Sequence, residues 1–158
     1  MKAVSIVSLA LSLCVALPAP AQRSPGADSA KAELFAVYQR SHAVKLNKDS
    51  AGYVAVFSRG FMEKLLKIMQ EQKIPTWQEY MSRVSDLEKR SSAGVTLVAQ
   101  RAAVTGDRAT LLVLLTKGCG EPGKPADCQA TVAFVREGGA WKIAGERQAE
   151  VPKVAPPG

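Results

Sequence analysis

The chain has 158 residues, of which 47% are hydrophobic, and its 21 Lys and Arg outnumber its 14 Asp and Glu, for a formal net charge of +7. A chain of this size buries enough surface for one core without a structural metal or obligatory oligomerisation, so a single domain is the natural inference. Its one histidine excludes a metal site built on several imidazoles.

The N-terminus has the layout of a signal peptide. Lys2 precedes an uncharged, mainly apolar run that ends at Ala21 in an Ala-x-Ala sequence, the pattern that a signal peptidase recognises. We therefore expect cleavage after Ala21, removal of residues 1–21, and a periplasmic or secreted protein. The remaining sequence has no second apolar run of membrane length, so we expect no membrane span in the mature chain.

Two cysteines, Cys119 and Cys128, remain after this cleavage. An oxidising compartment favours their pairing, which would close a short loop. Eight residues separate them, so they do not form a Cys-x-x-Cys redox motif. We expect a structural disulfide.

Helical patterns fill the first half of the mature chain. A linker is expected at 22–27, followed by a helix that begins at Asp28 or Ser29 and ends near Leu46. Its apolar stripe comprises Leu34, Phe35, Tyr38, His42 and Leu46. A short helical piece with Tyr53, Val54 and Phe57 follows.

Two further helices are predicted before the composition changes near Arg90. The first has Phe61, Leu65, Ile68 and Met69 on one face and stops before Pro75. The second begins with a capping box of Thr76 and Glu79. Its residues at helical spacing are Trp77, Tyr80, Met81, Val84 and Leu87.

Alternating patterns from Val95 onward predict four strands joined by hairpins. The strands are expected at Val95 to Val104, Ala109 to Lys117, Cys128 to Glu137 and Ala140 to Gln148. Gly106-Asp107 and Gly138-Gly139 form the tight turns, and residues 152–158 form a disordered tail. Helices first and strands second indicate an α+β fold, with helices packed on a curved, mainly antiparallel sheet, in one domain over 28–151.

The expected strand register follows from placing Cys119 opposite Cys128 and from the Gly138-Gly139 turn. It pairs Leu115 with Val132, Val113 with Phe134, Ile143 with Phe134, and Trp141 with Arg136. These residues, with Val98 and Val104, form the face that we expect to bury against the helices. The opposite face, a candidate surface for a homodimer, mixes Arg101, Lys142 and Glu146 with Leu112, Leu114 and Val135.

Two stretches resemble the nuclear transport factor 2-like superfamily, the α+β cone shared with ketosteroid isomerase and many small exported bacterial domains. One is the helix end at Asn47-Lys48-Asp49 followed by Tyr53, Phe57, Ser58 and Phe61; the other is the hairpin from Gly138 to Gly145. The resemblance implies helices closing over a curved sheet, with a cup that binds a small apolar ligand. Some members are enzymes and many are binding modules, and no residue here matches the enzymes' catalytic groups.

Five residues are candidates for ligand binding in such a cup: Tyr38, His42, Gln100, Arg136 and Trp141. His42 is either a packed, hydrogen-bonded helix residue or a pocket acid or base. Arg136 beside Trp141 is either a cation-π pair or an anchor for an anionic ligand. Thr96, Gln100 and Arg136 are the non-apolar side chains expected on the inner sheet face, whereas Glu137 and Glu146 are expected on the other.

The sequence contains no catalytic serine elbow and no phosphate-binding glycine loop, so we assign no catalytic residue, no metal and no cofactor. Several of the basic residues have an acidic residue four positions away on the same predicted helix, which balances their charge. No run of basic residues is interleaved with aromatic residues, so we expect no nucleic acid partner.

These observations favour an exported, non-enzymatic binding or accessory module of the cell envelope, which recognises a small ligand or an envelope protein. The alternative is a cofactor-free isomerase, dehydratase or hydrolase of the cone type acting on a small apolar substrate. It requires Tyr38, His42 and Arg136 to converge on one cavity.

Overall fold

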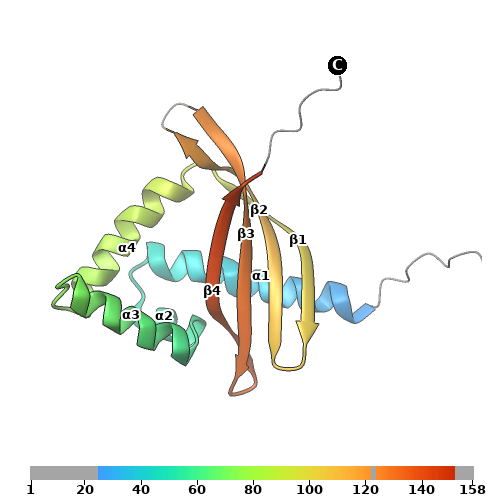
Figure 1. The fold of residues 1–158 in the computed structure, drawn as a ribbon, viewed down its shortest axis with the longest axis horizontal. Helices are drawn as coiled ribbons and strands as arrows, with labels where there is room; N and C mark the ends of the chain where they lie inside the picture. The colour runs from blue at the N-terminus through green and yellow to red at the C-terminus, as the bar shows by residue number, and fades with distance from the viewer. Residues whose placement is uncertain (1–24, 122–123, 152–158) are drawn as a thin grey trace, which may run out of the picture.

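The computed structural model describes residues 25–121 and 124–151, in which four helices are followed by four strands (Figure 1). The predicted α+β class is confirmed. The expected signal peptide at 1–21, its cleavage site at Ala21 and the tail at 152–158 lie outside the described residues. Within the described part of the chain, no helix is long and apolar enough to cross a membrane.

The first helix, α1 (Pro25–Leu46), ends where the sequence predicts but begins three residues before Asp28, inside the expected linker at 22–27. Proline explains the early start, because its fixed φ suits the first helical position and that position needs no N–H donor. Leu34 and Tyr38 of the predicted stripe are fully buried. In Figure 1, α1 runs across one face of the sheet.

Each of the next three helices begins at a side-chain cap. Asp49 accepts a hydrogen bond from the Gly52 N–H at the start of α2 (Ser50–Val56), and Ser58 caps α3 (Arg59–Glu71). Thr76 accepts from the Glu79 N–H, 3.2 Å away, at the start of α4 (Trp77–Ser92). The predicted start of α4 is therefore confirmed, since such caps satisfy otherwise unpaired N–H groups.

The buried faces of α3 and α4 differ from the predicted stripes at one residue each. Ile68 of α3 is 44% exposed and Leu87 of α4 is 61% exposed, so their placement on buried faces is wrong. Leu65 and Met69 are the buried residues of α3, while α4 buries Ser85 and Glu88. The buried stripe of α4 thus ends in polar groups.

The four strands form one antiparallel sheet in the order β1-β2-β3-β4. They are β1 (Thr96–Thr105), β2 (Arg108–Glu121), β3 (Lys124–Glu137) and β4 (Ala140–Glu150). The two outer hairpins turn at Gly106 and at Gly138-Gly139, all with positive φ, a conformation that costs glycine little. The predicted turns are confirmed.

The register is confirmed at one end of the sheet and wrong at the other. Next to the Gly138-Gly139 turn, Ile143 pairs with Phe134 and Trp141 with Arg136, as predicted. The β2–β3 pairs are displaced by four residues. Leu115 lies opposite Cys128, Leu111 opposite Val132 and Ala109 opposite Phe134, in place of the predicted Leu115 with Val132 and Val113 with Phe134.

An irregularity between Leu115 and Cys119 accounts for two of these four residues, and the other two arise because Cys119 lies opposite Ala126 and not opposite Cys128. Cys119 and Cys128 lie at disulfide distance, with Cα atoms 5.5 Å apart, but Cys119 pairs in the ladder with Ala126. The bridge therefore crosses the irregular segment instead of joining directly opposed residues. Because the displacement is even, each side chain keeps its predicted face.

The first strand turns a different set of residues inward from the predicted one. Val98 and Val104 are 46% and 45% exposed, so their assignment to the buried face is wrong. Leu97 and Ala99 pack against the core instead, and a bulge between Ala99 and Arg101 disrupts the alternation after them. The core lies between this face of the sheet and the four helices, each of which contributes buried residues.

Candidate functional site

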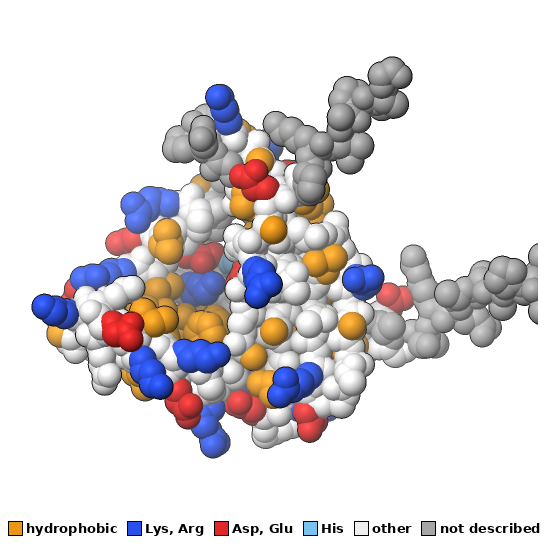
Figure 2. All heavy atoms as spheres, viewed as in Figure 1, with side chains coloured by type: hydrophobic (Ala, Val, Ile, Leu, Met, Phe, Trp, Pro, Cys, Tyr) orange, Lys and Arg blue, Asp and Glu red, His pale blue; other side chains and the backbone are white. Residues whose placement is uncertain are grey.

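A pocket of about 150 Å³ opens between the helices and the inner face of the sheet. The space-filling view in Figure 2 shows the hollow between the two layers, with hydrophobic, basic and acidic side chains inside it. The pocket is lined by His42, Lys45, Glu88, Ser91, Ser92, Val95, Leu97, Leu115, Gly118, Glu146 and Gln148. Its lining therefore combines an apolar wall with several polar groups.

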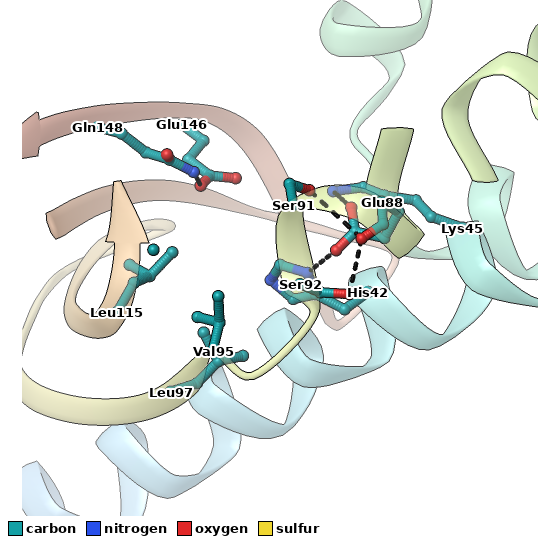
Figure 3. Close-up of a pocket in the computed structure, with 11 residues that line it drawn as sticks. His42, Lys45, Glu88, Ser91, Ser92, Val95, Leu97, Leu115, Glu146 and Gln148 are labelled. Atoms are coloured by element: carbon teal, nitrogen blue, oxygen red, sulfur yellow. Dashed lines mark hydrogen bonds and ion pairs between the residues drawn. The ribbon is translucent and has the colours of Figure 1, made fainter. Parts of the chain in front are cut away.

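The polar groups come from two helices on one side and from β4 on another. In Figure 3, His42 and Lys45 of α1 cluster with Glu88, Ser91 and Ser92 of α4, and they face Val95, Leu97 and Leu115 across the pocket. Glu146 and Gln148 project from β4. The site thus depends on three elements that are far apart in sequence.

Glu88 is the centre of the helical cluster and is only 8% exposed. One of its carboxylate oxygens is hydrogen-bonded to His42 Nδ1, and the other lies 3.4 Å from Lys45 Nζ. His42 and Lys45 lie three residues apart on α1, a spacing that places both on one side of the helix. Both partners therefore reach the same buried carboxylate.

The lowered pKa of Glu88 indicates which atom donates in its hydrogen bond with His42. Burial by itself raises the pKa of Glu88, but the hydrogen bond with His42 and the charge of Lys45 outweigh it, so that its pKa lies below the ordinary value. An ionised carboxylate only accepts hydrogen bonds, so Nδ1 of His42 carries the proton. In the neutral form of the ring this tautomer leaves a lone pair at Nε2, an atom that is buried and has no hydrogen-bond partner in the described chain.

Glu146 supplies the second carboxylate of the pocket, and a bulge in β4 turns it toward the inner face of the sheet. Phe134 pairs with Ile143 but Ala133 pairs with Gly145, so Ala144 is an extra residue. Glu146 consequently lies opposite inward-facing Val132. The prediction that Glu146 lies on the outer face is wrong, because regular alternation does not allow for the extra residue.

Two neutral hydrogen-bond donors position the Glu146 carboxylate in the pocket. Tyr38 Oη donates to Glu146 Oε1 over 3.0 Å, and Gln148 Nε2 donates to the same oxygen over 2.7 Å. Burial, followed by the charge of Glu146, raises the pKa of Tyr38, so the phenol remains protonated and donates. Tyr38 also packs edge-on against the His42 ring, with centroids 4.7 Å apart.

An aromatic cleft of about 280 Å³ adjoins this site and shares Lys45, Glu88 and Glu146 with it. Its aromatic lining consists of Tyr53, Phe57, Phe61 and Tyr80. The Tyr53 and Tyr80 hydroxyls lie 3.0 Å apart, and burial raises the pKa of both. The three charged residues therefore stand between an aliphatic pocket and an aromatic cleft.

Of the five predicted ligand-binding residues, the structure brings only Tyr38 and His42 to this site, and it pairs Arg136 with Trp141 elsewhere. The Arg136 guanidinium lies over Trp141, 4.5 Å from the ring centroid, beside the Gly138-Gly139 turn. Trp141 is five residues before Glu146 on β4, a distance of roughly 15 Å along a strand. The convergence of Tyr38, His42 and Arg136 that the enzyme alternative requires is therefore not found.

Gln100 is also placed elsewhere. Its side chain accepts a hydrogen bond from Gln129, 2.7 Å away, and Gln129 alternates with buried Cys128 and Ala130 on β3. Gln100 therefore lies on the outer face, contrary to prediction, because it occupies the bulge in β1.

Sequence reasoning missed Lys45, Glu88, Glu146 and Gln148. Helical spacing could have indicated Glu88, since it lies three residues after Ser85 and seven after Met81, both buried on α4. No comparable pattern identifies Glu146, which depends on the bulge. Within residues 25–121 and 124–151, no three His, Cys, Asp or Glu side chains are grouped to hold a metal.

No protein-family model and no curated protein matches the chain. Among solved structures, it is similar to the Bdellovibrio bacteriovorus protein Bd1075, with 14% identity, a TM-score of 0.49 and coverage of 80% of this chain; it spans 42% of that protein. A de novo designed β-sheet protein has 12% identity and a TM-score of 0.40, over 84% of this chain and 95% of its own. The chain is also similar to an NTF2-like protein of unknown function from Pseudomonas putida KT2440. The two are 15% identical with a TM-score of 0.46, over 82% of this chain and 98% of that protein.

Proposed function

We propose that the protein is a binding module exported to the cell envelope, whose pocket holds a small, mainly apolar molecule. The observation that carries this proposal is the pocket of about 150 Å³ with an apolar wall opposite a polar wall built on Glu88. An apolar cavity of this size accommodates a benzene-sized group. Specific small-molecule sites combine such walls with a few fixed polar groups.

Neighbouring residues on β1 provide a matched test of this site. Leu97 lines the pocket, whereas Val98 lies on the outer face and is 46% exposed. We expect a panel of benzene-sized fragments, followed by ligand-observed NMR, to give binders for the wild type and for Val98→Trp but not for Leu97→Trp, which fills the pocket. Equal binding to both variants, or no binder for the wild type, would contradict the proposal.

Export is supported by the disulfide-distance cysteine pair, which is typical of oxidising compartments. The corresponding test is N-terminal sequencing of the protein recovered from the periplasm or the medium, which should begin at Gln22. Recovery of the intact precursor from the cytoplasm with both thiols reduced would exclude export.

The geometry of His42 favours a second candidate function, a cofactor-free enzyme that moves a proton. Glu88 orients the imidazole through its hydrogen bond with Nδ1, so in the neutral ring Nε2 can act as a general base. Besides Glu88, the further ionisable groups of the same pocket are Lys45 and Glu146, and not Arg136. A bound fragment with an acidic C–H group, incubated in D₂O, should gain deuterium with the wild type and not with His42→Gln, whose binding should persist. Binding of the fragment without deuterium uptake would contradict the enzyme candidate and would agree with the binding module.

A further inference from the structure

The pocket presents hydrogen-bond acceptors where a ligand would need them. Glu146 Oε1 is engaged by Tyr38 and Gln148, whereas Oε2 of this exposed residue has no hydrogen-bond partner among the described residues. His42 Nε2, buried in the wall of the same pocket without a described partner, is a second acceptor when the ring is neutral with its proton on Nδ1. A ligand that satisfies these atoms must donate hydrogen bonds.

Charge favours a cationic donor over a neutral one. The pocket contains two carboxylates, Glu88 and Glu146, and one ammonium, Lys45. Lys45 is directed to Glu88, at 3.4 Å, whereas the described partners of Glu146 are a neutral phenol and a neutral amide. The carboxylate of Glu146 therefore keeps a net negative charge that a bound ammonium would balance.

The surroundings of Glu146 suit an ammonium carried on an apolar body. Val95, Leu97 and Leu115 form the aliphatic wall on one side. On the other side, Tyr53, Phe57, Phe61 and Tyr80 line the aromatic cleft that Glu146 shares, and aromatic ring faces attract cations. The Lys45 ammonium already lies 6.0 Å from the centroid of the Phe57 ring.

We propose that the ligand is a small primary amine, bound as its ammonium by Glu146, with an apolar body of about benzene size in the adjoining pocket. This inference rests on the proposed binding function and names the ligand class of that site. The ammonium donates to Glu146 Oε2, and the apolar body contacts Leu97 and Leu115.

Three probes of nearly equal shape test the inference: benzylamine, benzyl alcohol and benzoate, each titrated at pH 7 by calorimetry or NMR. Hydrogen bonds to charged groups are stronger than neutral ones, so we expect benzylamine to bind about tenfold more tightly than benzyl alcohol. Benzoate should bind most weakly, because it would place a third carboxylate in the pocket. Added salt should weaken benzylamine binding and leave benzyl alcohol nearly unchanged.

A matched pair of variants locates the charge effect. Glu146→Gln keeps the shape and the acceptor for Tyr38 and should reduce the preference for the amine to about twofold or less. Glu71→Gln, at the exposed end of α3, removes the same charge elsewhere and should keep the tenfold preference. Thermal unfolding of both variants verifies that they fold. The comparison of the three probes uses the wild type and does not require either variant to fold.

The outcomes separate the inference from the proposed function. If benzyl alcohol or benzoate binds as tightly as benzylamine, the pocket binds ligands but the amine assignment is wrong. If Glu146→Gln retains the full preference, Glu146 is not the anchor and the inference is overturned. If none of the three probes binds, both the inference and the proposed binding function are overturned.

Discussion

The two ends of the β3–β4 ladder have different compositions and different tasks. At the end next to the Gly138-Gly139 turn, Phe134 and Ile143 are 2% exposed and Trp141 is 4% exposed, and the apolar side chains close the core. Beyond Ala144, the inward residues are Glu146 and Gln148, and the two layers part to form the pocket. The closed end therefore stabilises the core, whereas the open end of β4 places polar side chains toward the pocket.

The largest expected effect is at the closed end. Phe134→Ala removes a ring that is 2% exposed, and truncating a buried phenylalanine should lower the free energy of unfolding by about 3–5 kcal/mol. Urea denaturation at pH 7 measures this change. Val135→Ala, on the opposite face of the same strand, should cost about 1 kcal/mol or less; equal losses would show that the closed end is not the core.

Reduction of the disulfide comes next and affects the open end. Cys119 and Cys128 are separated by nine positions, and closing a loop of this length stabilises a protein by about 2–3 kcal/mol in the chain-entropy model. Hydrogen exchange in the presence of reductant should show lower protection near Leu115 and unchanged protection near Phe134. A Cys119→Ser variant should not respond to reductant, and a uniform loss of protection in the wild type would contradict the division into two ends.

Glu88→Gln should have a smaller effect that depends on pH. The substitution retains an acceptor for His42 but loses the charge facing Lys45, at a cost of about 1–2 kcal/mol at pH 7. Because the folded-state pKa of Glu88 is depressed, its stabilisation is present above the unfolded pKa of about 4.3 and is lost as pH falls through the folded pKa. Urea midpoints between pH 7 and pH 3 should therefore converge for the wild type and the variant. A gap that stays constant down to pH 3 would show that ionisation of Glu88 contributes nothing.

The smallest effect on stability is expected at Glu146. Its carboxylate is exposed to the pocket mouth and is held by neutral partners, so Glu146→Gln should change the free energy of unfolding by about 0.5 kcal/mol or less. Thermal unfolding measures this change. A loss as large as that of Phe134→Ala would mean that Glu146 is part of the core, and the contrast between the two ends would fail.

Local patterns in the sequence predicted most of the secondary structure. The cap at Thr76 and the turn at Gly138-Gly139 depend on neighbouring residues only, and both are confirmed. The pairing of Ile143 with Phe134 follows directly from that turn. Several errors lie where extra residues enter a strand, at Gln100, between Leu115 and Cys119, and at Ala144, because a bulge interrupts the alternation of side chains. The exposed Ile68, Leu87 and Val98 are errors of face assignment that involve no bulge.

The part of the candidate site that the sequence analysis identified lies on α1. Tyr38 and His42 share a helical stripe, so sequence spacing places them together. Glu88 reaches His42, 46 positions away in sequence, only because α1 and α4 pack side by side. Glu146 is more remote still, 108 residues from Tyr38 in sequence.

The sequence by itself determined the α+β class, the order of the elements, the helix caps and the tight turns, because each depends on contacts within a few residues. Only the tertiary structure decided which polar groups share the pocket. That choice depends on the packing of two helices and on one extra residue in β4, which turns Glu146 from the outer face to the inner face. A single-residue change of register reverses the direction of every following side chain, and for this reason the chemistry of the pocket is set by the fold.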